Sequence, residues 1–170
     1  MRTLKKLNLQ QLETEAQVVR QLDQRSILGG TGVMTTLPHC YFDNMLYYSG
    51  QYGTNYTLTG LEAQFDQAYG AGAHNNVSPA QATAFTSTLF NASHIDNSQI
   101  GSMVQSGVSV STDYQTSPGV SHAITLTYYD SKTGNYIGID TSNNNSAIVL
   151  SSSQVGYGGY AEAIYGKIPD

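Results

Sequence analysis

Cysteine and long apolar runs are nearly absent from this 170-residue chain. The single cysteine, Cys40, excludes an internal disulfide and any zinc finger built from paired cysteines. The four histidines show no paired ligand spacing, so we expect no metal site. No apolar run approaches the roughly 20 residues that a bilayer-spanning helix needs. The sequence therefore predicts no stable membrane insertion.

Basic residues are almost missing after residue 30. Residues 31–170 hold only Lys132 and Lys167 against nine acidic residues, a net charge of −7, whereas residues 1–30 have a net charge of +2. A domain with so little positive charge cannot neutralise phosphates, which argues against binding to nucleic acid. It argues equally against attraction to an anionic membrane. The change in charge also separates residues 1–30 from residues 31–170, which we predict to form one domain.

The first thirty residues predict an amphipathic helix over about 7–22 that is followed by Gly29 and Gly30. They lack the apolar core of a Sec signal peptide. The segment resembles the double-glycine leaders of bacteriocins and related secreted peptides. The resemblance implies that an ABC exporter with its own peptidase domain binds the leader and cuts after Gly30, releasing a secreted protein. An ordinary N-terminal helix with a glycine cap remains the alternative.

The remaining chain changes its hydrophobic period from helical to alternating. Helices are predicted at about 39–49, 57–68, 79–90 and 97–105. Strands are predicted at about 108–112, 122–129, 135–140, 147–150 and 160–167. Helices first and an antiparallel sheet second predict an α+β domain, with the N-terminal helices packed on the C-terminal sheet.

Three residues of this pattern suggest nucleophilic chemistry. Cys40 begins a predicted helix, where free backbone N–H groups and the helix dipole favour a thiolate. His122 opens one predicted strand and Asp140 ends the next, so the two can face one another across a hairpin, about 5 Å apart at Cβ. A structural cysteine, a core histidine and a turn carboxylate are the alternative interpretation of the same three residues.

The segments around these residues resemble bacterial papain-like cysteine peptidases, over most of residues 34–167. Residues 121–130 resemble the family's histidine strand, and residues 136–140 resemble the strand that follows. The resemblance is strongest to the branch that contains the double-glycine-cutting peptidases. It implies a papain-like fold, no cofactor, and peptide-bond hydrolysis with Cys40 as nucleophile, His122 as acid and base, and Asp140 as the residue that orients the histidine.

One part of the family pattern is missing. The family places a glutamine, an oxyanion donor, several residues before the cysteine, where this chain offers only Thr35 and Thr36 as weak candidates. Losing one such donor lowers rates by about 10²–10³-fold.

The sequence leaves several functions open. The favoured one is a secreted peptidase that acts on a peptide or protein, and a close variant is a cell-wall amidase that uses the same triad. The missing glutamine favours a secreted binding or antagonist protein without turnover. A structural or adhesive surface protein rich in tyrosine, asparagine and glycine is a third class.

Overall fold

The structure, a computed structural model, describes residues 40–117 and 120–169. The helices of this part of the chain are α2 Cys40–Tyr52, α3 Leu58–Tyr69, α4 Pro79–Leu89 and α5 Ile100–Gln105, with short 3₁₀ turns at Ala73–Asn75 and Asn97–Gln99. The strands are β1 Phe90–His94, β2 Ser109–Ser117, β3 Val120–Asp130, β4 Asn135–Asp140, β5 Ser146–Ser151 and β6 Ala161–Lys167.

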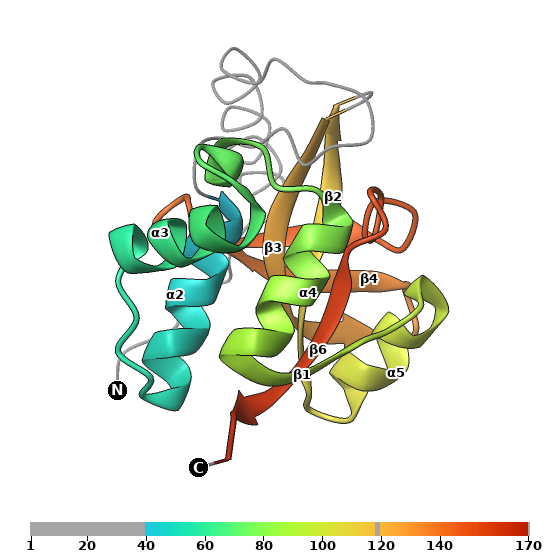
Figure 1. Cartoon of the computed structure of the whole chain (residues 1–170). Coiled ribbons are helices and arrows are strands. Elements are labelled where there is room, and N and C mark those ends of the chain that lie inside the picture. Colours follow the sequence, from blue (N-terminus) through green and yellow to red (C-terminus); the bar gives the residue numbers. More distant parts are fainter. Residues whose placement is uncertain (1–39, 118–119, 170) are drawn as a thin grey trace, which may run out of the picture.

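The strands form a single antiparallel sheet with the order β1-β6-β2-β3-β4-β5. Figure 1 shows α2, α3 and α4 gathered on one side of this sheet, while α5 lies apart from them. Two separate clusters of buried residues correspond to the two sides. The predicted α+β class is therefore confirmed.

Aromatic rings fill the cluster between the sheet and the helices α2–α4. Phe65 is fully buried and packs edge-to-face against Phe42 and Phe85, with ring centroids 5.5 and 5.0 Å apart. Tyr41 packs edge-to-face against Phe42 and Tyr160. Edge-to-face pairs add roughly 0.5–1.5 kcal/mol each beyond the area that they bury. Tyrosine and phenylalanine thus supply the core of a chain that contains no tryptophan.

The cluster on the other side of the sheet is mostly aliphatic. Ile124 and Leu126 of β3 pack with Ile100 and Val104 of α5. Gly138 of β4 lies directly beside them, and a Cβ there would come within 2.5 Å of the Ile124 Cδ1 atom. The close approach of β4 to these side chains therefore requires a glycine at position 138.

A local capping signal sets the start of α4. Ser78 accepts a hydrogen bond from the Gln81 N–H and forms a capping box with it, and Pro79 occupies the first turn of α4. The predicted end of the first helix at Gly50 is wrong. Helix α2 continues to Tyr52, and Gly53 ends it because this residue adopts a left-handed φ of 69°.

Two strands differ from the prediction. Strand β1 was not predicted, because Phe90–His94 carries only one buried residue and gains its order from pairing with β6. Strand β2 extends past residue 112 because the ladder with β3 continues through buried Asp113 and Tyr114. The charged residue Asp113 inside β2 interrupts the alternating pattern, so the sequence did not predict this extension.

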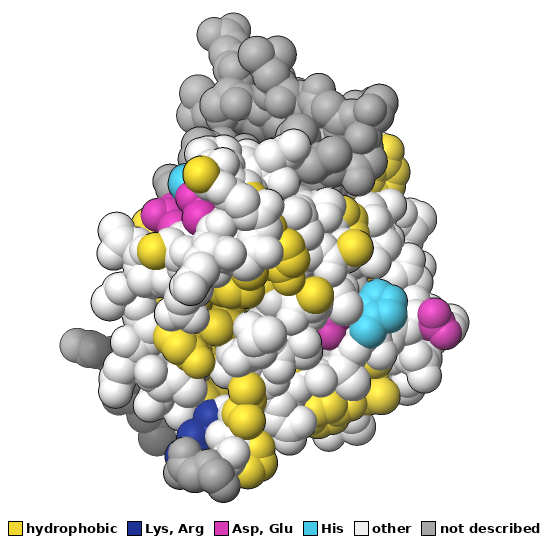
Figure 2. Space-filling view, viewed as in Figure 1, with side chains coloured by type: hydrophobic (Ala, Val, Ile, Leu, Met, Phe, Trp, Pro, Cys, Tyr) yellow, Lys and Arg dark blue, Asp and Glu magenta, His cyan; other side chains and the backbone are white. Residues whose placement is uncertain are grey.

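The surface carries few charges. Figure 2 shows isolated charged side chains on a face that is otherwise mostly uncharged. This agrees with a content of only 11% charged residues. Within residues 40–117 and 120–169, no helix is both long and apolar enough to cross a bilayer.

Candidate functional site

Cys40, the one cysteine of the chain and the first residue of α2, places its sulfur against the middle of the sheet. The Ala123 N–H of β3 donates a hydrogen bond to Cys40 Sγ over 3.4 Å. The pairing of β4 with β3 begins at Thr125, so at Ala123 the edge of β3 faces the start of α2 instead. The edge of a strand thus directs one N–H group towards the sulfur of the residue that begins α2.

His122 connects the sulfur to a carboxylate. Its Nε2 atom lies 2.9 Å from Asp140 Oδ1, and Cys40 lies close enough to the ring to act on its pKa. Burial alone would lower the pKa of His122, but the hydrogen bonds to Asp140 and Cys40 and the charges of both groups raise the pKa to about 10. The imidazole is therefore protonated at neutral pH and can donate to both neighbours.

Asp140 reaches His122 diagonally across the β3–β4 hairpin. The residues Thr125 and Ile139 lie opposite each other, so Asp140 is nearest Ile124 in the ladder, two residues from His122. The predicted contact of His122 with Asp140 across the hairpin is therefore formed, and it is diagonal, because diagonal neighbours share a face and long side chains can bridge them. The Asn143 N–H donates to the same Asp140 Oδ1 over 3.2 Å, which fixes the carboxylate within its own turn.

The structure therefore brings Cys40, His122 and Asp140 together from three separate elements. The sulfur is buried and only 3% of His122 is exposed, whereas the Asp140 side chain is 14% exposed. A substrate can reach the sulfur only after part of the surrounding chain moves. The predicted oxyanion residues Thr35 and Thr36 and the predicted leader site at Gly29 and Gly30 lie outside the described residues.

A second buried carboxylate, Asp113, lies next to this group and was not recognised in the sequence. It pairs with Ala123 in the ladder, and its Oδ2 accepts the Gly158 N–H. Burial raises the pKa of Asp113 to about 6, although hydrogen bonds from the backbone of Gly158 and Tyr160 and from Ser121 oppose the increase. Asp113 thereby anchors residues 156–160 beside the strand that carries His122.

The loop at residues 156–160 is only partly exposed, unlike its prediction as an exposed segment. Tyr157 is 45% exposed, whereas Tyr160 is fully buried in the aromatic cluster. A Cβ at Gly158 would clash with the Asp113 carboxylate, so this close contact favours glycine. The rings of Tyr114 and His122 pack edge-to-face, with their centroids 5.6 Å apart. Tyr114 also forms an isolated antiparallel β-bridge with Val155.

The two other described histidines lie elsewhere. His74 Nδ1 is 2.8 Å from Asp66, and His94 Nδ1 is 2.9 Å from buried Glu162. His94 belongs to β1. Among the residues that the structure describes, no cluster of three His, Cys, Asp or Glu side chains could hold a metal ion.

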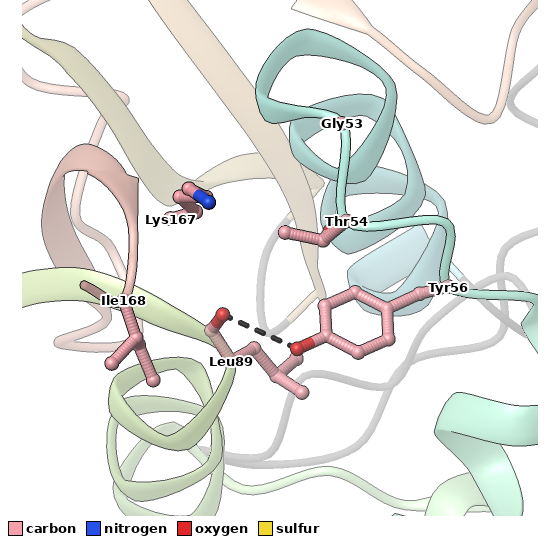
Figure 3. A pocket seen from close by; sticks show the side chains of 6 residues that line it. All are labelled: Gly53, Thr54, Tyr56, Leu89, Lys167 and Ile168. Atoms are coloured by element: carbon pink, nitrogen blue, oxygen red, sulfur yellow. Dashed lines mark hydrogen bonds between the residues drawn. The ribbon is translucent and has the colours of Figure 1, made fainter. Parts of the chain in front are cut away.

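An open hollow of about 300 Å³ lies at the other end of α2 (Figure 3). Its lining consists of Gly53, Thr54, Tyr56, Leu89, Lys167 and Ile168. Gly53 follows the last residue of α2, and a helix of 13 residues is about 20 Å long. The hollow is therefore remote from Cys40 and is not part of the cysteine–histidine–aspartate group.

Comparison of the chain with protein-family models, with curated proteins and with solved structures finds no match. The chemistry of this site must be argued from its own geometry.

Proposed function

We propose that this protein is a secreted papain-like cysteine peptidase. One observation carries the proposal: the only thiol of the chain lies beside a histidine that is hydrogen-bonded to a carboxylate. Cys40, His122 and Asp140 come from a helix start, a strand and a strand end, in the chain order of papain-like enzymes. A nucleophile, a base and a group that orients the base are the parts of a catalytic triad.

Each residue has a defined role in the proposed reaction. The Cys40 thiolate attacks the carbonyl carbon of a peptide bond, and the electron pair moves to the carbonyl oxygen. His122 then donates its proton to the leaving amine, and the C–N bond breaks to leave a thioester. Water attacks the thioester while His122 accepts a proton, and the thiolate leaves. Asp140 keeps the ring oriented and stabilises its protonated form.

The oxyanion formed in both steps needs donors. The Cys40 N–H lies in the first turn of α2, where backbone N–H groups have no partner within the helix. We propose that this group acts with Thr35 or Thr36 in place of the missing glutamine. A slow enzyme is the expected consequence, because each missing donor costs about 10²–10³ in rate.

The pH dependence of iodoacetamide labelling tests the cysteine–histidine pair. In the wild type, the hydrogen bonds and charges around His122 raise its pKa to about 10, so a positive charge stays beside the sulfur at neutral pH, and the proposed mechanism uses this charge to activate Cys40. We expect a labelling rate that changes little between pH 6 and 8. In His122→Ala the rate should rise roughly tenfold per pH unit, as for an ordinary thiol with a pKa near 8.5.

His74→Ala is the matched control, because His74 is also bonded to a carboxylate but pairs with Asp66 rather than with Asp140. Its labelling profile should match the wild type. Because the sulfur is buried, each rate is compared with that of the same variant in denaturant, which exposes one thiol per chain. Identical profiles for wild type and His122→Ala would refute the proposed pair.

Export through a double-glycine leader is part of the same proposal. It rests on the sequence of residues 1–30, in which a predicted amphipathic helix precedes Gly29 and Gly30. The exporter would recognise the helix, and its peptidase domain would cut after Gly30. Mass spectrometry of material secreted by a cell with such an exporter should find a chain that starts at Thr31. Secreted protein that retains residues 27–30 would contradict this assignment.

A secreted binding protein that has lost turnover is the second candidate. The complete burial of Cys40 favours it, since a substrate carbonyl has no direct access to the sulfur. A cell-wall amidase would use the same three residues on a different amide. The hydrolysis assay described in the Discussion separates turnover from binding.

A further inference from the structure

One asparagine connects the helix of the nucleophile to the turn of the carboxylate. Asn44 lies four residues after Cys40, hence on the same face of α2, and is fully buried. Its Oδ1 accepts a hydrogen bond from Thr141 Oγ1 over 2.7 Å, and Thr125 Oγ1 lies 3.5 Å from the same atom. Thr141 directly follows Asp140 in the chain.

A second hydrogen bond joins α2 to the same turn. Ser142 Oγ donates to Asp43 Oδ2 over 2.6 Å. Two consecutive residues of α2 therefore hold the two consecutive residues that follow Asp140. A turn held at two adjacent points can neither rotate nor shift along the helix, so the carboxylate keeps its distance from the start of α2.

Asn44 also belongs to a network of buried hydroxyl groups. Its Nδ2 donates to Ser111 Oγ over 3.4 Å, and the Tyr160 hydroxyl donates to the same oxygen over 3.0 Å. Tyr160 and Tyr41 both hydrogen-bond to Thr86. The network of hydrogen bonds therefore extends from Asn44 to Tyr41, the residue that follows Cys40. Fully bonded polar networks in a low-dielectric interior are rigid.

We propose that Asn44, acting through Thr141, is a positioning residue that sets the place of Asp140 and thereby the protonation of His122. This inference rests on the proposed function. Helix α2 carries the sulfur, the end of β4 carries the carboxylate, and His122 lies between the two. Asn44 fixes these two ends relative to each other, so the imidazole can contact both at once.

The pH profile of Cys40 labelling by iodoacetamide is the test, because a purely structural role would lower stability without moving that profile. Thr141→Val removes the hydroxyl and keeps the shape. We expect its labelling rate at pH 6 to fall about tenfold, the equivalent of one pKa unit, while the rate at pH 9 stays close to that of the wild type. Thr141→Ser restores the donor and should restore the wild-type profile.

Thr127→Val is the matched control, because its hydroxyl bonds to the Ile137 carbonyl on an exposed part of the same hairpin. Its profile should stay that of the wild type. If Thr141→Val does not fold, Ser142→Ala removes the second hydrogen bond between α2 and this turn and should shift the profile in the same direction by a smaller factor.

The outcomes separate this inference from the proposed function. If His122→Ala changes the profile and Thr141→Val or its substitute does not, the positioning role is wrong and the proposed function stands. If His122→Ala leaves the profile unchanged, the cysteine–histidine pair fails and the positioning role fails with it.

Discussion

The His122→Ala variant is expected to lose hydrolysis of a fluorescently labelled, unfolded protein substrate down to background. In a triad the nucleophile and the base act as a unit, and removing either one lowers the rate by about 10⁶-fold in a serine peptidase. His122 lies beside the sulfur and hydrogen-bonds to Asp140, so it connects these two groups. Without it, the leaving amine receives no proton.

Three further variants sharpen this experiment. Cys40→Ala should lose activity to the same extent as His122→Ala, and the double variant should lose no more than either single one. His74→Ala should retain full activity. The measurement follows the release of fluorescent fragments by the full-length chain and by the chain that begins at Thr31.

The wild-type chain decides between the two candidate functions. Turnover by the wild type that disappears in Cys40→Ala supports the peptidase. Wild-type protein that binds the substrate but releases no fragments over many hours would identify the binding protein and refute the enzyme. Hydrolysis that survives in Cys40→Ala would place the chemistry elsewhere.

Replacing Phe65 with alanine is expected to lower the free energy of unfolding by about 3–5 kcal/mol. Phe65 is fully buried, and its ring contacts the rings of Tyr41, Phe42, Tyr69 and Phe85. Only Leu61 and Phe65 of α3 are buried, so this one ring provides much of the attachment of α3 to the domain. The substitution leaves a cavity between α2, α3 and α4 that their rigid neighbours cannot fill.

Urea unfolding followed by circular dichroism measures this change. Gln64→Ala, one residue earlier on the exposed side of the same helix, should change the unfolding free energy by less than about 0.5 kcal/mol. A loss below about 1 kcal/mol for Phe65→Ala would mean that α3 contributes little to the core. Because Phe65 also contacts Tyr41, the residue after Cys40, labelling of Cys40 should accelerate as the helix start loosens.

Local signals in the sequence predicted much of the fold. The hairpin of β3 and β4 was predictable because Asp130 and Gly134 mark a turn between two apolar runs, and Asp130 indeed accepts hydrogen bonds from Lys132 and Thr133. The capping box at Ser78 was visible for the same reason. These features depend on residues only a few positions apart, so the order of the amino acids is sufficient to predict them.

The pairing of residues far apart in the chain was harder to predict from the sequence. The three residues of the candidate site were singled out by their chain order, but the diagonal reach of Asp140 to His122 follows from a sheet register that bulges set. Asn44 gave one usable signal, its spacing of four from Cys40 on a helix. Nothing nearby in the sequence marked Thr141 as its partner, because these two residues are 97 positions apart.

The amino-acid order by itself determined the α+β class, the positions of most helices and strands, and the choice of Cys40, His122 and Asp140 as candidates, since period, caps and turns are local properties. The tertiary structure alone decided that these three side chains meet, that the sulfur is buried, and that Asp113 and Asn44 are enclosed polar groups. Burial and hydrogen bonding across the sheet depend on which surfaces pack together. That choice belongs to the whole fold, because each contact forms only when segments far apart in the chain have all reached their places.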